Sequence, residues 1–432
     1  QGKAAAINLA MTLMTGTRLW VVDDDDIACP DALQKLGAAL DANPSAGFSY
    51  GRHDRFTDPA NGGERVWQDT GYWREGHPRD FLIATMEDMF THQSGMLFQK
   101  TLLDATGPFD TGLKRSVDYD YILRAARIST SVACPAIVFH QRQHDGDRGS
   151  GANRFPASEL VRRWIQHDQI IFKRIYETWA LDEFLPRGES VVGAPSKRQA
   201  LIQRGAIMAR KKLWDHAMRD FANAALLMDI DLTPAERAIA RRGSQSKYGI
   251  QELLDDHVIG QGLRDVAGLS RNGAELIGEL ATGFRWRIRD ELTSGHPRKA
   301  SRLLQLYITL TSSAFHFFIE RQRIVIRDKT GVVLHQALIL DRILSHFWQV
   351  IVIDANLGQL QGRAAFRAQL HHMVDKGTRV LGHANDGTEI RIVLGGDDRI
   401  EPQDRRQHQR IRHTVRHMEQ RAQRIGHRMN GR

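Results

Sequence analysis

The apolar run Leu19-Trp20-Val21-Val22 leads directly into four consecutive aspartates, Asp23 to Asp26. Such a run has the pattern of a buried strand, which carries a dense patch of carboxylate at its carboxyl end. In open α/β sheets, ligands bind in the crevice beyond the carboxyl ends of the strands. Carboxylates packed this closely oppose each other's ionisation unless a cation lies among them, which indicates a divalent metal site. The alternative is a solvated acidic turn that favours the positive end of the helix opened by Pro30.

Along an extended backbone, neighbouring side chains point to opposite faces. Asp23 and Asp25 then share one side of the chain, and Asp24 and Asp26 share the other. An Asp-x-Asp pair can hold a divalent ion through one acid while the second orients a neighbouring ligand, and hard oxygen donors suit Mg²⁺ or Mn²⁺. We therefore expect Asp23 and Asp25 to form the site, with Asp24 and Asp26 supporting the turn.

Helical and strand patterns alternate through residues 1–185. Helices are expected over residues 2–14, 33–40, 79–89, 117–127 and 161–179, and strands over residues 19–22, 95–98 and 136–139. This alternation is typical of an α/β domain with a mostly parallel sheet flanked by helices.

A stretch rich in proline and glycine, residues 186–197, is predicted to be a linker to a helical region over residues 198–320. Small and large residues in this region follow the spacing of a tetratricopeptide unit, in which two antiparallel helices interlock: Leu201, Gly205, Met208, Trp214, Ala217, Phe221 and Ala224. A second unit near residues 284–304 is weaker, and such arrays normally need about three repeats. A simple helical hairpin packed on the first domain is therefore an equal alternative.

The remaining residues show no motif that points to chemistry. Residues 321–398 are expected to be mixed α/β or irregular, with strand-like pieces at 324–326, 350–353 and 390–394. The net charge of +9 lies mainly in residues 399–432, which hold ten arginines against three acidic residues. This basic tail is predicted to be disordered, and it lacks the aromatic residues that stack on bases, so nucleic acid is not an expected partner.

The two cysteines, Cys29 and Cys134, have no metal-ligand spacing and cannot form a disulfide framework. Both points favour a reducing compartment, so we expect a cytoplasmic protein, with the inner face of the membrane as an alternative. The apolar stretches are too short or too interrupted to span a bilayer.

Four short motifs follow one another along residues 2–150. They are Gly2-Lys3-Ala4-Ala5-Ala6-Ile7-Asn8; Val21 to Asp26 with Pro30 and Leu33 behind them; Gly107-Pro108-Phe109-Asp110 followed by Asp118-Tyr119-Asp120 and Arg124; and Arg142-Gln143-His144. In order and spacing, these motifs resemble glycosyltransferase family 2, the nucleotide-sugar enzymes with the GT-A fold. The resemblance implies an inverting, metal-dependent transferase of the hexosyltransferase type, which moves a sugar from a nucleoside diphosphate sugar to a glycan or other hydroxyl acceptor.

The resemblance also implies roles for the acidic residues. Asp25 is the expected direct metal ligand, and Asp23 assists the metal or the nucleotide, with Mn²⁺ or Mg²⁺ neutralising the leaving diphosphate. His144 is a candidate third ligand, and its alternative is an exposed loop histidine. Asp118 matches the general base that takes the acceptor's proton, although it can also simply favour a helix N-terminus.

The other implied contacts divide between donor and acceptor. Donor-binding residues are Asn8, Asp23 and Asp24, and acceptor or diphosphate contacts are Gln93, Ser94 and Arg142. Asp120 is expected to make an i,i+4 ion pair with Arg124. Two residues depart from the family pattern, because Ile7 replaces an arginine and Val117 replaces a glutamate.

The chain does not begin with Met, and no strand precedes its first helix. We therefore expect an N-terminally truncated domain that lacks part of its nucleotide site and has weak or no activity in isolation. An alternative is a non-catalytic adaptor, in which a degenerate transferase scaffold carries a helical region that binds a partner protein. Glycosidase chemistry ranks third, because two acids flanking a glycosidic bond do not call for four aspartates at a strand end.

Overall fold

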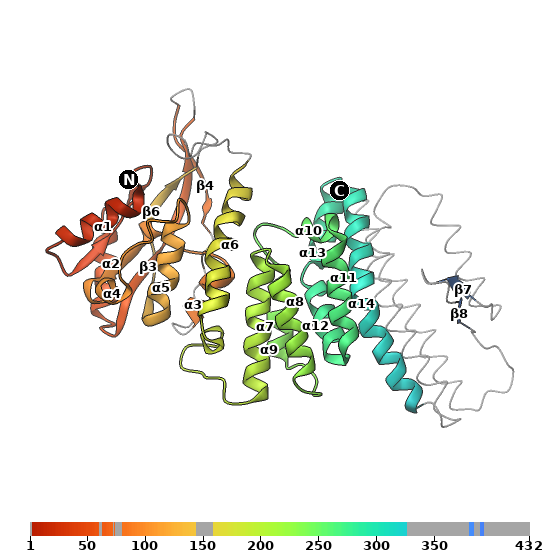
Figure 1. Cartoon of the computed structure of the whole chain (residues 1–432). Coiled ribbons are helices and arrows are strands. Elements are labelled where there is room, and N and C mark those ends of the chain that lie inside the picture. Colours follow the sequence, from red (N-terminus) through yellow and green to blue (C-terminus); the bar gives the residue numbers. More distant parts are fainter. Residues whose placement is uncertain are drawn as a thin grey trace, which may run out of the picture. The chain divides into compact units, whose positions relative to one another are not determined.

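The computed structural model describes residues 2–59, 63–71, 73, 80–143, 159–325, 380–383 and 389–392. It divides into two compact units, Gln1–Gln336 and Ala337–Arg432. The first unit begins as an α/β part and continues as a stack of helices (Figure 1).

The α/β part runs from α1 to a short 3₁₀ turn, η5. The linker predicted over residues 186–197 is shorter than expected, because α7 already begins at Ala194. Its strands are β1 (Arg18–Trp20), β2 (Ile27–Ala28), β3 (Ala46–Thr57), β4 (Val66–Thr70), β5 (Met96–Gln99) and β6 (Thr130–Arg142). Its helices are α1 (Lys3–Leu13), α2 (Ala32–Asp41), α3 (Phe81–Glu87), α4 (Lys100–Thr106), α5 (Val117–Ile128) and α6 (Leu160–Thr178), with 3₁₀ turns η2 (Gln93–Gly95) and η5 (Leu181–Phe184).

These strands form a mixed sheet in the order β1-β5-β3-β6-β2, with β4 paired to β3. The predicted α/β class is confirmed, but the expected mostly parallel sheet is corrected to a mixed one. Only β3 and β6 pair in parallel among the described strands, whereas β5 runs antiparallel to both β1 and β3. β4 follows β3 after a short connection, which permits an antiparallel hairpin but no parallel crossover. As a result β1, β3 and β6 point the same way, and the carboxyl ends of β1 and β6 share one edge.

Helices cover both faces of this sheet. On one face, Leu36 and Leu40 of α2 pack against Val138 and Phe139 of β6 in a small core. On the other face, a much larger core contains Phe48 and other side chains of β3 and β5 together with the buried sides of α3, α5 and α6. This larger core continues without interruption into the helices that follow, so the α/β part and the helical part share one interior.

The region predicted to be helical over residues 198–320 is confirmed as helical. It contains α7 (Ala194–Arg210), α8 (Trp214–Leu226), α9 (Pro234–Gly243), α10 (Glu252–Asp255), α11 (His257–Leu269), α12 (Arg271–Thr282), α13 (Arg285–Thr293) and α14 (Pro297–Val325). The residue spacing that suggested interlocking helices matches the packing of α7 on α8, where Gly205 faces Phe221 and a Cβ at Gly205 would lie 2.6 Å from the ring. The strand expected at residues 324–326 was wrong, because Ile324 and Val325 belong to α14. An apolar run of three residues is too short for its periodicity to distinguish a strand from a helix.

In the second unit, β7 (Val380–His383) pairs antiparallel with β8 (Glu389–Ile392). β8 covers the first part of the strand expected at residues 390–394. The strand expected at residues 350–353 and the basic tail at 399–432 lie outside the described residues. In the part of the chain that the structure describes, no helix combines the length and the apolar character needed to cross a bilayer.

The α7–α8 contact predicts a position where even one methyl group is too large. Gly205→Ala places a Cβ 2.6 Å from Phe221 and 3.3 Å from the carbonyl of Ala217, so we expect a loss of about 1–3 kcal/mol in unfolding free energy. Gly268→Ala in α11 is the matched control, because nothing lies within 4 Å of its Cβ position. Urea unfolding of both variants tests the contact, and equal stabilities would contradict it.

Lys211, at the end of α7, predicts how stability depends on pH. Burial lowers the pKa of this fully buried ammonium to about 8, although Asp168 and Asp88 raise it; Lys247 and Arg210 lower it further. Its ordinary pKa of 10.5 applies in the unfolded chain, which therefore binds more protons than the folded one between these values. The unfolding free energy of the native protein should rise by about 2 kcal/mol more than that of Lys211→Met between about pH 8 and pH 10. Urea unfolding measures both free energies. If they change equally with pH in the native protein and in Lys211→Met, the pKa of Lys211 is not lowered in the folded protein.

Candidate active site

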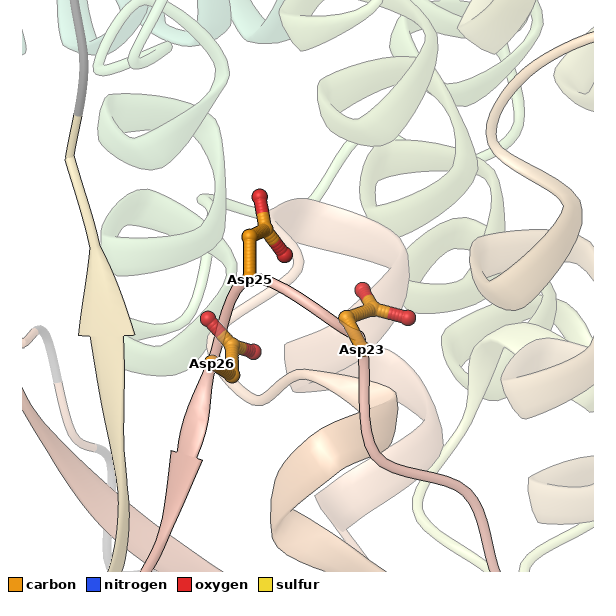
Figure 2. A group of neighbouring side chains, drawn as sticks. All are labelled: Asp23, Asp25 and Asp26. Carbon is orange, nitrogen blue, oxygen red and sulfur yellow. The ribbon is translucent and has the colours of Figure 1, made fainter.

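The four aspartates lie on a turn that follows β1, and three of their carboxylates converge there. The backbone N–H of Asp26 donates to the carbonyl of Asp23 at 3.1 Å, which closes the turn. The side chains of Asp23, Asp25 and Asp26 are neighbours on this turn (Figure 2). One carboxylate oxygen of each lies within 4.8 Å of the other two, while Asp24 is exposed. The expectation that Asp26 faces away with Asp24 was wrong, because the chain turns after Asp23 and does not continue extended.

Ser94, in the η2 turn, holds this acidic turn from one side. Its hydroxyl donates to Asp26 Oδ2 at 2.8 Å and accepts from the backbone N–H of Asp23 at 3.1 Å. The indole N–H of Trp20, the last residue of β1, donates to the carbonyl of Ser94 at 2.8 Å. The neighbouring Gln93 is 2% exposed, and neither polar atom of its amide has a hydrogen-bond partner among the described residues.

Arg142, the last residue of β6, holds the acidic turn from a second side. Its backbone N–H donates to Asp26 Oδ1 at 3.3 Å, and its Nε donates to the carbonyl of Asp25 at 3.0 Å. Its guanidinium also forms an ion pair with Asp58. These contacts follow from the antiparallel pairing of β2 with β6, which places Ile27 opposite His140 and the preceding aspartates beside Arg142. His144, predicted to be a third metal ligand, lies outside the described residues.

The carboxylates in the turn are not electrostatically balanced. Burial raises the pKa of Asp26 to about 6, the charges of Asp25 and Asp23 raise it as well, and the hydrogen bonds from Ser94 and Arg142 lower it only in part. A divalent cation would remove this repulsion, and the site offers it several hard oxygen donors. The residues present therefore fit Mg²⁺ or Mn²⁺.

Lys3 supplies a positive charge beside the turn that the residue pattern did not single out. Its ammonium donates to Asp23 Oδ1 at 2.5 Å from the first turn of α1. Burial alone lowers the pKa of Lys3, but the charges of Asp118 and Asp23 raise it above the ordinary value. The ammonium of Lys3 therefore binds the acidic turn directly and interacts electrostatically with Asp118. Its place next to Gly2 in the first motif was the signal available for finding it.

Asp118 and Asp120 occupy the first turn of α5 but have different surroundings. Asp118 is half-buried and accepts a 2.9 Å hydrogen bond from the backbone N–H of Tyr119. Asp120 is 2% exposed, and its two oxygens pair with Arg124 and Arg174. The expected i,i+4 ion pair of Asp120 with Arg124 is therefore present.

Asn8 is placed beside the third motif. Its side-chain N–H donates to the carbonyl of Phe109 at 2.9 Å, and its Oδ1 accepts from the N–H of the same residue at 2.8 Å. Phe109 in turn stacks on Tyr121 of α5 with ring centroids 3.8 Å apart. Asn8 thus fixes the segment that leads into α5, and its donor-binding role stays a prediction.

Comparison with known proteins connects this site to a family. Residues 1–107 match the family model described as glycosyl transferase family 2, so the N-terminal region carries a domain of this family. A protein of Sinorhizobium fredii, named Uncharacterized protein y4gI, is 29% identical over 119 residues. That match covers 28% of this chain and 12% of the relative, so the chain corresponds to a small part of that protein's length. Asp118 and Arg142 lie beyond the residues matched by the family model.

Proposed function

We propose that the N-terminal domain transfers a sugar from a nucleoside diphosphate sugar to a hydroxyl acceptor with inversion at the anomeric carbon. The observation that supports this best is the convergence of three carboxylates on the acidic turn, where the ammonium of Lys3 binds Asp23 and also interacts with the charge of Asp118. The glycosyltransferase family 2 match over residues 1–107 supports the reaction class.

Asp25 and Asp23 are the proposed metal ligands, with Asp26 beside them and His144 as a further candidate. When bound there, Mn²⁺ or Mg²⁺ would act as a Lewis acid that stabilises charge on the leaving diphosphate. Ser94 and Arg142 keep the acidic turn in place through hydrogen bonds to Asp26. Among the donor contacts, Asp24 is exposed and able to reach a nucleotide.

Asp118 is the proposed general base. It would accept the proton of the acceptor hydroxyl as that oxygen bonds to the anomeric carbon and the bond to the diphosphate breaks. The neighbouring Asp120 is less suited, because it is buried and both its oxygens are in ion pairs.

Gln93 is the proposed acceptor or diphosphate contact with the best support. Its amide is buried beside the acidic turn and has both a donor and an acceptor without a hydrogen-bond partner in the described residues. A sugar hydroxyl can satisfy both at once. The free thiols Cys29 and Cys134 agree with a cytoplasmic location.

The metal site is tested by comparing neighbouring aspartates. Asp25→Asn should weaken Mn²⁺ binding by about tenfold or more, because it removes a charged oxygen ligand. Asp24→Asn is the matched control, since Asp24 is exposed and outside the convergent group, and its affinity should stay within about twofold. Titration calorimetry measures both. If the two variants lose Mn²⁺ affinity equally, or if neither loses it, the acidic turn is not the metal site.

The general base is tested by Asp118→Asn. The turnover number for sugar transfer should fall by about 10²–10⁴-fold while Mn²⁺ affinity is unchanged, because the amide cannot accept the proton. Asp104→Asn on α4, which removes an exposed ion pair with Lys100, is the control. The assay screens nucleoside diphosphate sugars with Mn²⁺ and measures the released nucleoside diphosphate. Undiminished transfer by Asp118→Asn would exclude this residue as the base.

A further inference from the structure

A fully buried lysine joins the helical part to the helix that carries Asp118. Lys211 directly follows α7 as its C-cap residue and has no exposed surface. Its ammonium donates to the hydroxyl of Tyr119 at 2.9 Å and to the carbonyl of Glu87 at 3.1 Å. It also lies 5.0 Å from the ring centroid of Tyr119 and 4.7 Å from that of Phe172, within cation–π range.

Tyr119 connects this lysine to the proposed base. It directly follows Asp118, and its backbone N–H donates to the Asp118 carboxylate at 2.9 Å. Its hydroxyl donates to the carbonyl of Thr85 at 2.6 Å and accepts from Lys211, so both ends of the residue are held. A movement of Lys211 would therefore shift the residue whose amide fixes the base.

A second set of contacts reaches the start of α5 through Asp168 of α6. Asp168 is 2% exposed and accepts from the hydroxyl of Tyr248, in the helical part, at 2.7 Å. Asp168 Oδ1 accepts from the hydroxyl of Ser116 at 3.5 Å. The ammonium of Lys211 lies 3.8 Å from Asp168 Oδ2, the oxygen that also binds Tyr248. Ser116 precedes α5 with φ of +53°, a left-handed conformation that residues with a Cβ rarely adopt. Such a conformation persists where surrounding contacts impose it.

This junction uses charged and hydroxyl groups where apolar ones would pack without a desolvation penalty. Burying an ammonium and a carboxylate is unfavourable unless each is paired and hydrogen-bonded, and replacing such a pair by apolar side chains is often neutral or stabilising. The contacts here satisfy the polar groups and end on the first turn of α5. Apolar side chains would suffice to hold the two parts together. The polar contacts instead hold the first turn of α5 in one orientation.

We propose that the helical part positions the Asp118 carboxylate through Lys211, Tyr248 and Asp168, and that the catalytic domain therefore extends past residue 185 into these helices. The proposal rests on the proposed function for the role of Asp118. Lys211, Tyr248 and Asp168 are positioning residues, since their contacts reach the base only through Tyr119 and Ser116.

Two variants and one control test this in the full chain. Tyr248→Phe removes only the hydroxyl bonded to Asp168, and Lys211→Met removes the charge at similar length. Tyr176→Phe is the matched control, because its hydroxyl donates to Asp220 at 3.2 Å, also between α6 and the helical part but away from α5. Hydrogen–deuterium exchange over residues 116–124 is measured together with transfer kinetics and Mn²⁺ titration.

In Tyr248→Phe and Lys211→Met, amide exchange over residues 116–124 should be faster by about fivefold or more, with exchange in α2 unchanged. The turnover number should fall by about tenfold at unchanged donor KM and unchanged Mn²⁺ stoichiometry, because the base is misplaced in protein that is otherwise intact. A purely structural role would lower the Mn²⁺ stoichiometry and the turnover number together. If Lys211→Met does not fold, Tyr248→Phe alone carries the test.

The positioning proposal is overturned if exchange over residues 116–124 in Tyr248→Phe equals that in Tyr176→Phe, whatever the activity. Failure of the proposed function gives a different result. In that case the native chain transfers sugar from no nucleoside diphosphate sugar, or Asp118→Asn retains transfer, while the exchange of residues 116–124 still responds to Tyr248→Phe.

Discussion

The candidate site depends on the pairing of β2, which directly follows the acidic turn, with β6. Their antiparallel register places Ile27 opposite His140 and therefore brings Asp26 beside Arg142 at the end of β6. The η2 turn adds Ser94, whose hydroxyl binds the same carboxylate. Without these contacts, three carboxylates within 4.8 Å of one another would repel and the turn would open. Burial, together with the charges of Asp25 and Asp23, raises the pKa of Asp26, and the hydrogen bonds from Ser94 and Arg142 offset this only in part. Carboxyl groups with perturbed pKa values cluster at functional sites.

Local patterns in the sequence predicted the helices well. α2, α5 and α6 appear where apolar spacing indicated them, since each buries one face against the sheet core. β3 escaped detection because its segment, AGFSYGRHDRFT, mixes glycine and charged residues with apolar ones and lacks a clear alternation. The alternation of helices and strands indicated a mostly parallel sheet, but β5 and β4 both pair with β3 in the antiparallel sense.

The acidic residues were predicted to be important from their position, but their geometry was not. Alternation along a strand separates Asp26 from Asp23, whereas the turn hydrogen bond between them brings the two together. The contacts of Lys3 with Asp23, and of Lys211 with Tyr119, join residues 20 and 92 positions apart. No local period encodes such pairs, because they arise only when the sheet and the helices have packed.

Asp118 and Asp120 illustrate how distant segments give neighbouring residues different roles. Both are aspartates in one helical turn, so residue type and spacing do not distinguish them. Arg174 of α6 and Arg124 occupy the two oxygens of Asp120, which leaves it suited to holding α5 in place. Among the hydrogen bonds described, Asp118 accepts only one, from the backbone N–H of Tyr119. The hydroxyl of Tyr119 in turn accepts from Lys211 in the helical part. A base needs a fixed position and an accessible carboxylate at once. Holding the neighbouring residue meets both needs, because the contacts that fix the turn do not consume the oxygens of the acid.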